Sequence, residues 1–127
     1  MRPLILIAPI LLAACNTTAN PEAAQSAAFA RELAGHVAGP PQSCVSVFPN
    51  QNLRVIDSRT IAYGYGRTIY VNRLAGGCPA LSAYNTVIAE VQGSQYCRGD
   101  RVRGREPGAI IAGPWCNLGS WTPYRQP

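Results

Sequence analysis

The sequence predicts a mainly β fold: a small antiparallel β-barrel or curled sheet, stapled by two disulfides and preceded by a short N-terminal helix or tether. Three observations predict it. Short runs of branched and aromatic residues, separated by glycine and proline, are typical of antiparallel strands. The chain has 127 residues, the length of one domain. Its 5 cysteines, 12 glycines and 11 prolines are typical of loop-rich exported domains that depend on cross-links.

Residues 1–14 have the pattern of a signal peptide, and Cys15 follows directly. Arg2 supplies a positive charge, and the apolar run at 4–14 is too short to span a bilayer. The run ends in Leu12-Ala13-Ala14-Cys15, which resembles the lipobox of bacterial lipoproteins and implies cleavage before Cys15 and lipidation of its thiol. Lipidation of Cys15 also leaves an even number of cysteines, four of the five, for disulfide bonds. The alternative is an ordinary signal peptide that is cut elsewhere.

The residue after the lipobox bears on the destination of the protein. Asn16 stands where lipoproteins retained at the inner membrane typically have Asp, so the resemblance implies the outer membrane, facing the periplasm. The membrane is then a partner through the lipid anchor. Export from the cytoplasm argues against nucleic acid as a partner.

The net charge of the chain is positive. Its 11 basic residues are all arginine, and the net charge is +5. The part from Gln42 onward keeps this value, with nine arginines against four acids. Such a balance favours an anionic partner, such as phospholipid headgroups, lipopolysaccharide or an acidic protein.

Residues 15–43, the lipidated cysteine and an Ala/Pro-rich segment, are predicted to form a tether, with a helix over 21–38. Asn20 suits the N-cap and Pro21 the first helical position. An apolar stripe follows at helical spacing: Phe29, Leu33 and Val37. Gly39-Pro40-Pro41 is the expected stop. A flexible, partly helical spacer is the alternative.

The β domain is expected over 44–127. Strands are predicted at 53–57, 60–63 and 85–91, with weaker candidates at 101–103 and 109–112 and a closing strand within 115–121. Arg-Thr-Ile occurs at 59–61 and again at 67–69, around Gly64-Tyr65-Gly66. This repeat predicts a β-hairpin in which three tyrosines pack across the strands: Tyr63, Tyr65 and Tyr70.

Four cysteines remain for the β domain: Cys44, Cys78, Cys97 and Cys116. They lack the close C-x-x-C pairs of zinc sites, so disulfides are predicted and neither a metal nor a cofactor is expected. Three pairings are open. We favour Cys44–Cys116, which ties the first strand to the last, with Cys78–Cys97 nested inside.

The order of short motifs around these cysteines is similar to an uncharacterised family of small proteobacterial envelope proteins, known as a domain of unknown function. The segments that carry the resemblance are Cys44, 55–61, 70–74, 78–81, 97–100 and 116–119. The resemblance covers Cys44 to about Trp121. It implies an exported β domain with four cysteines and implies no activity.

Residues suited to catalysis are few. The one histidine, His36, lies in the predicted tether, where a solvated residue near a helix end is expected rather than a base. Four acids fall in the β domain: Asp57, Glu90, Asp100 and Glu106. Turn capping or pairing with arginine is the expected role of each. A glycan or cell-wall hydrolase that uses Asp57 or Asp100 is the alternative.

The densest positive cluster is Arg98, Arg101, Arg103 and Arg105. On a strand over 101–105, three of these side chains point to one face, which could hold an anion by bidentate contacts. A solvated, charged edge is the alternative. Arg98-Gly99-Asp100 matches the tripeptide that integrins bind, but a turn is the better explanation. Two interpretations are open for Trp115, Trp121 and Tyr124: a plug of the core or an exposed platform for sugar or protein. The cysteine beside Trp115 favours the core, and Tyr124 favours the surface.

These observations together predict a non-enzymatic lipoprotein of the bacterial envelope that acts through binding or structure. Its expected partner is an anionic envelope polymer or another envelope protein, met by the segment 98–105. A narrower version is an inhibitor or accessory subunit of a periplasmic enzyme, with a protruding loop at 98–108 as the reactive element. The hydrolase is the alternative from another class.

Overall fold

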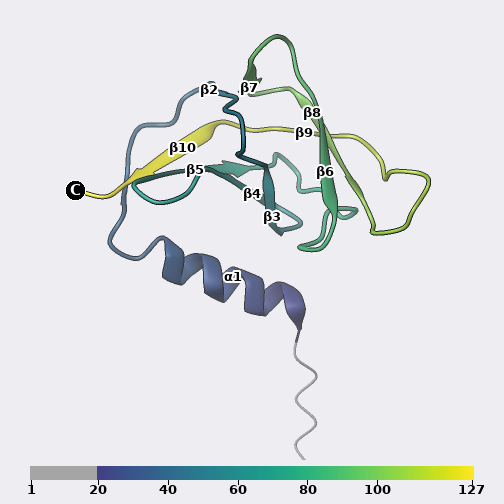
Figure 1. Cartoon of the computed structure of the whole chain (residues 1–127), viewed down its shortest axis with the longest axis horizontal. Coiled ribbons are helices and arrows are strands. Elements are labelled where there is room, and N and C mark those ends of the chain that lie inside the picture. The colour runs from purple at the N-terminus through teal and green to yellow at the C-terminus, as the bar shows by residue number, and fades with distance from the viewer. Residues whose placement is uncertain (1–19) are drawn as a thin grey trace, which may run out of the picture.

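The computed structural model describes residues 20–127 (Figure 1). The predicted signal peptide, Cys15 and Asn16 lie outside the described residues. The described part is mainly β, with antiparallel sheets, one short helix and two disulfides, as the sequence predicts.

The strands form three separate sheets, and the one helix of the described residues packs against the sheet that contains β3. The elements are α1 (Pro21–Glu32), β1 (Val37–Ala38), β2 (Cys44–Ser46), β3 (Arg54–Asp57), β4 (Thr60–Tyr63), β5 (Thr68–Arg73), β6 (Thr86–Glu90), β7 (Gln95–Cys97), β8 (Arg101–Arg105), β9 (Cys116–Asn117) and β10 (Trp121–Arg125). The strand orders are β1-β10-β5-β4-β3, β6-β8-β9 and β2-β7, with antiparallel neighbours throughout. Within residues 20–127 these sheets do not close into a barrel.

The hairpin predicted around Gly64-Tyr65-Gly66 is formed by β4 and β5. Tyr63 pairs with Tyr70, and their ring centroids lie 6.5 Å apart. Tyr65 does not join them across the strands. It is 58% exposed at the turn, where the Arg54 guanidinium carbon lies 4.1 Å from its ring centroid.

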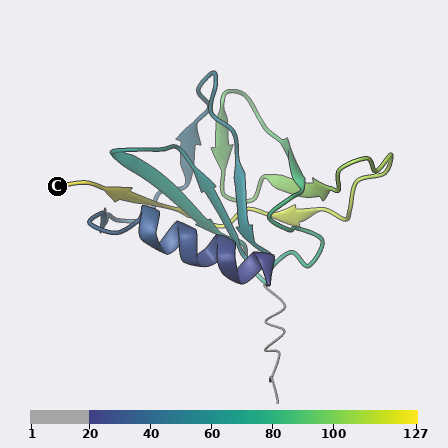
Figure 2. The same ribbon diagram turned by 60° about the horizontal axis from the view of Figure 1, so that its bottom comes forward.

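Strand β4 is buried on both faces because the five-stranded sheet is the middle layer of the fold (Figure 2). Ile61 and Tyr63 face a core shared with the two smaller sheets, which includes Val102 and Trp121. Ala62, between them, faces a second core beneath the helix. The alternation of side chains along a strand therefore divides β4 between two cores.

The helix begins as predicted but ends early. Asn20 caps it, with its side chain accepting a hydrogen bond of 3.0 Å from the Glu22 amide. It ends at Glu32 rather than residue 38, because Gly35 adopts φ of +80°, a left-handed conformation that terminates helices. Phe29 and Leu33 pack in the second core, whereas Val37 is 62% exposed in β1.

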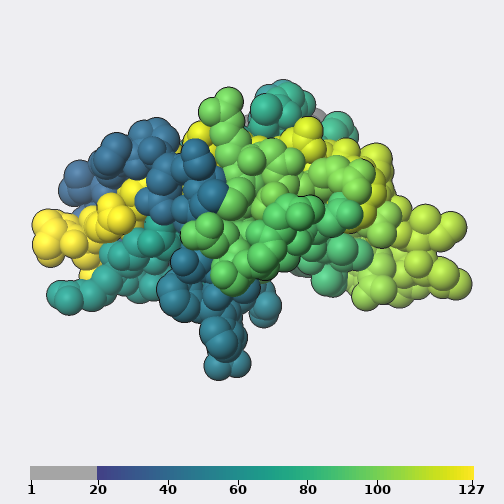
Figure 3. Space-filling view, turned by 90° about the horizontal axis from the view of Figure 1, so that it is seen from above, coloured from purple at the N-terminus to yellow at the C-terminus, as the bar shows by residue number. Residues whose placement is uncertain are grey.

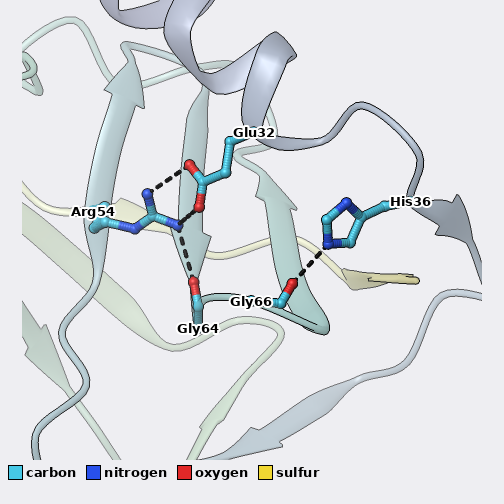
Figure 4. A network of polar contacts seen from close by, with 5 residues as sticks. All are labelled: Glu32, His36, Arg54, Gly64 and Gly66. Carbon is cyan, nitrogen blue, oxygen red and sulfur yellow. Dashed lines mark hydrogen bonds and ion pairs between the residues drawn. The ribbon is translucent and has the colours of Figure 1, made fainter.

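The segment predicted as a tether packs on the sheet from residue 21 onward (Figure 4). Glu32 accepts two hydrogen bonds from Arg54 on β3, at 2.9 and 3.0 Å, and Arg54 donates a third to the Gly64 carbonyl. His36 then bonds the Gly66 carbonyl at 2.7 Å, and β1 pairs with β10. Helix and linker are thus held to the β4–β5 turn.

The disulfide pairing predicted from the sequence is wrong. Cys44 pairs with Cys97 and Cys78 with Cys116. Cys44 and Cys97 lie directly opposite each other on β2 and β7, with Cα atoms 4.0 Å apart, so a bridge closes across the ladder. Cys78 lies in the turn after β5, where its side chain is buried, and meets Cys116 on β9.

The strand predicted at 109–112 is also absent. Residues 106–115 form a loop between β8 and β9 instead, because Pro107-Gly108 and Gly113-Pro114 on either side of the run favour turns. The loop projects from the body of the fold in both ribbon views (Figures 1 and 2).

Candidate anion-binding face

Strand β8 presents three arginines on one side of its sheet, as predicted. Its residues alternate between exposure and burial, so that Arg101, Arg103 and Arg105 point outward while Val102 and Gly104 point inward. Because Gly104 has no side chain, the Asn85 side chain can lie close to its backbone on the inner side of the strand. An added Cβ would lie 2.6 Å from the Asn85 side-chain nitrogen. Strand β6 pairs with the whole of β8, and β9 pairs with its first two residues, so the ladder holds this row in place.

Trp115 lies against two of these arginines. The Arg103 guanidinium carbon is 4.2 Å from the centroid of the Trp115 ring, and that of Arg101 is 4.9 Å away. Both distances are typical of cation–π contacts. The predicted core position of Trp115 is wrong: its side chain is 36% exposed, and Trp121 is the buried tryptophan. We call Arg101, Arg103, Arg105 and Trp115 the arginine face.

The charge of this face is only partly neutralised. Glu90, opposite Arg101 on β6, forms an ion pair with it. Within residues 20–127, no carboxylate pairs with Arg98, Arg103 or Arg105. The face therefore keeps guanidinium groups that no carboxylate of the described residues neutralises.

Arg98 belongs to the turn that leads into β8. Its amide donates to the Ser43 carbonyl at 2.7 Å, and its side chain is exposed. The turn is built by Asp100, whose carboxylate accepts a hydrogen bond from the Cys97 amide at 2.7 Å, and by Gly99 with φ of +90°. The tripeptide 98–100 is thus a turn, as expected. Since 101–105 is a strand, the protruding loop predicted at 98–108 is wrong.

The carboxylates proposed for hydrolysis do not share a site. Asp57 accepts a hydrogen bond from the Arg59 amide at 2.8 Å, as a turn-capping residue does, and lines a hollow of about 200 Å³ beneath the helix. Asp100 lines a different hollow, of about 330 Å³, with Glu90. In the part of the chain that the structure describes, no three His, Cys, Asp or Glu side chains are grouped as metal ligands.

A further hollow, of about 570 Å³, lies between β6, β7 and the segment before β3. Its lining includes Val47, Leu53, Val87 and Tyr96 and contains no charged side chain. Burial raises the pKa of the Tyr96 hydroxyl, and the neighbouring Tyr63 hydroxyl raises it further. The hollow suits an uncharged group and offers no acid or base pair.

No described helix, within residues 20–127, has the length and apolar content of a membrane span. Comparisons of the chain with protein-family models, curated proteins and solved structures give no match. The family resemblance therefore stays a prediction.

Sequence reasoning found the arginines of this site but missed Trp115 and the tip of the adjacent loop. The Arg-x-Arg-x-Arg alternation is a strand signal in its own right. Trp115 follows Gly113-Pro114, a pair that is typical of an exposed turn, and this signal outweighs its neighbour Cys116.

Proposed function

We propose that this protein is a bacterial envelope lipoprotein that binds an anionic component of the envelope on its arginine face and catalyses no reaction. A lipid on Cys15 anchors it to the outer membrane, on the periplasmic side. The ligand is a phosphate- or carboxylate-bearing polymer or lipid, or an acidic envelope protein.

The observation that carries the binding role is the position of two guanidinium groups over one exposed indole. A guanidinium group held over a ring by a cation–π contact can still donate hydrogen bonds to phosphate or carboxylate. A row of arginines that serves only solubility needs no such support. The indole also reduces the entropy lost on binding, because it already restricts the two side chains.

The pairing of the other four cysteines supports lipidation of Cys15. The two disulfides use Cys44, Cys78, Cys97 and Cys116 of the five cysteines, which leaves Cys15 for lipidation. Disulfides of this kind form in oxidising compartments such as the periplasm.

The first test measures binding of the full-length protein, in a neutral detergent, to dextran sulfate as a soluble polyanion. The variant R101Q/R103Q/R105Q loses three charges from the face. R31Q/R67Q/R125Q loses the same charge from exposed positions outside β8. We expect the face variant to bind about tenfold more weakly or worse, since 1.4 kcal/mol is already a factor of ten. The control should lose much less. Equal losses would mean that net charge alone attracts the polymer and would refute the proposed site.

The anchor has its own test. Cys15→Ala should abolish incorporation of a labelled fatty acid. Fatty-acid labelling of the variant at the level of the unmodified sequence would refute lipidation at this residue.

A further inference from the structure

The loop that follows the arginine face is uncharged and ends in exposed aliphatic side chains. From Pro107 to Tyr124 the sequence contains no charged residue. At the tip, Ile110 is 96% exposed and Ile111 is 84% exposed. The space-filling view shows this segment, in yellow-green, as a protrusion at one end of the molecule (Figure 3). Aliphatic side chains presented to water in this way mark an interaction surface.

The loop is braced at its base. The Gly113 amide donates to the Gly104 carbonyl at 2.8 Å, and Ala109 donates to Glu106 at 3.0 Å. The Cys78–Cys116 disulfide ties the end of the loop to the turn after β5. The two isoleucines are therefore held away from the core, and little conformational entropy is lost when the tip binds a partner.

The side chains of the loop and its base combine the residue types of a bilayer interface. Aliphatic residues form the tip, Arg105 precedes the loop at the end of β8, and Trp115 lies beside Arg103 where the loop ends. Tryptophan prefers the level of the headgroups, and arginine is attracted to anionic lipid. From Pro107 to Pro114 no side chain can donate or accept a hydrogen bond, which suits lipid better than the mixed polar surface of a protein partner.

Contacts connect the start of the helix to the base of this loop. The Glu22 carboxylate accepts a hydrogen bond from the Ser58 amide at 3.2 Å, and the Ser58 carbonyl accepts one from Cys78 at 2.6 Å. Cys78 is the residue bonded to Cys116. Both ribbon views place the N-terminal end of α1 and the loop away from the C-terminus (Figures 1 and 2). Between Cys15 and the helix lie residues 16–20, which span at most about 18 Å.

We propose that the loop 106–115 inserts its isoleucine tip into the interface of an anionic phospholipid bilayer, with the arginine face on the headgroups. The inference rests on the proposed function and names its ligand: the membrane that carries the lipid anchor. Insertion is shallow, because the backbone groups of an irregular loop must stay hydrated. The anchor and the loop then form two contacts that fix the orientation of the domain on the membrane.

The test uses the full-length lipidated protein in vesicles of phosphatidylcholine and phosphatidylglycerol, with bromine on the acyl chains near the headgroups. The protein has two tryptophans, and Trp121 is completely buried. We expect brominated lipid to remove roughly half of the emission, since only Trp115 lies at the depth of an interfacial loop. Trp115→Phe should abolish this quenching.

The variant I110S/I111S stays attached through its lipid, so a change in quenching reports the loop and not attachment. We expect it to lose most of the quenching. Phe48→Ser, which removes a side chain 53% exposed in the segment between β2 and β3, should keep all of it. Quenching that is absent from the unmodified protein, or equal in I110S/I111S, would overturn the insertion.

The two proposals can fail separately. Loss of quenching together with normal, face-dependent binding of dextran sulfate would overturn the insertion and leave the anion site. The opposite result is also possible: the unmodified protein is quenched, I110S/I111S is not, and the two arginine variants bind dextran sulfate equally. This result would overturn the anion site and support lipid contact by the loop alone. A photoreactive phenylalanine at position 110 that couples to a protein instead of phospholipid would replace the membrane with that partner.

Discussion

At the scale of single residues, Trp115 contacts two of the three arginines that alternate along β8. Side chains on the same face of a strand are neighbours, so their like charges destabilise the row. The indole offsets part of this cost by contacts with Arg101 and Arg103, each contributing about 0.5–1 kcal/mol at an exposed site, and Glu90 offsets more through Arg101. Arg105 has neither kind of support among residues 20–127 and is the most available for a ligand.

Tyr96 gives a pH dependence that can be measured. Burial, and then the Tyr63 hydroxyl, raise its pKa above the ordinary value of 10.0, so the folded state disfavours the phenolate. The unfolded chain ionises first as the pH rises, and the stability contributed by neutral Tyr96 is present below about pH 10 and lost as the pH passes the raised value. We expect Tyr96→Phe to flatten the fall in unfolding free energy between about pH 9 and 12, measured by urea denaturation.

A matched control for this prediction is Tyr84→Phe, which alters a side chain that is 68% exposed. It should leave the alkaline slope unchanged. A Tyr96→Phe slope that equals the original would show that other tyrosines dominate the titration.

At the scale of elements, the sequence predicts the hairpins and helix ends that depend on residues close together in the chain. The β4–β5 hairpin follows from glycines in its turn, and the helix start follows from Asn20 and Pro21. The helix end was misplaced because the apolar stripe continues to Val37, past Gly35. Val37 instead pairs with Arg125 on β10, a contact between distant residues that no local pattern reveals.

The contact between Glu32 and Arg54 connects the helix to the sheet. Both side chains are partly exposed, at 29% and 19%, so their pairing contributes less than a fully buried pair. Glu32→Gln keeps the size of the side chain but leaves the Arg54 guanidinium without its counter-charge. We expect a loss of about 1–2 kcal/mol in unfolding free energy and faster amide exchange in α1, measured by hydrogen exchange.

Glu106→Gln removes an exposed carboxylate that forms no ion pair within residues 20–127 and serves as the control. Its unfolding free energy should stay within about 0.5 kcal/mol of the original. Slow amide exchange retained in α1 of Glu32→Gln would show that Phe29 and the second core suffice to hold the helix.

At the scale of the whole molecule, the sequence does not predict the disulfide pairing, because the pairing depends on how three sheets pack together. A single curled sheet would bring its first and last strands together and would favour a bond between them. In the structure β2 pairs with β7 instead, and Trp121 of the last strand lies in the shared core. The arginine face was predictable because it lies on one strand, whereas its indole comes from a loop that the Cys78–Cys116 bond positions.

The two disulfides should therefore differ in what they support. Their sequence separations are 53 and 38 residues, so the chain-entropy model gives each about 4 kcal/mol. We expect C44A/C97A and C78A/C116A to lose comparable unfolding free energy in urea. Only C78A/C116A should also weaken dextran sulfate binding and shift the Trp115 emission, because its bond fixes the loop base beside β8. The other bond joins β2 to β7, neither of which contributes to the arginine face. Equal binding by both variants, measured where both remain folded, would mean that the β6-β8-β9 ladder alone positions the arginine face.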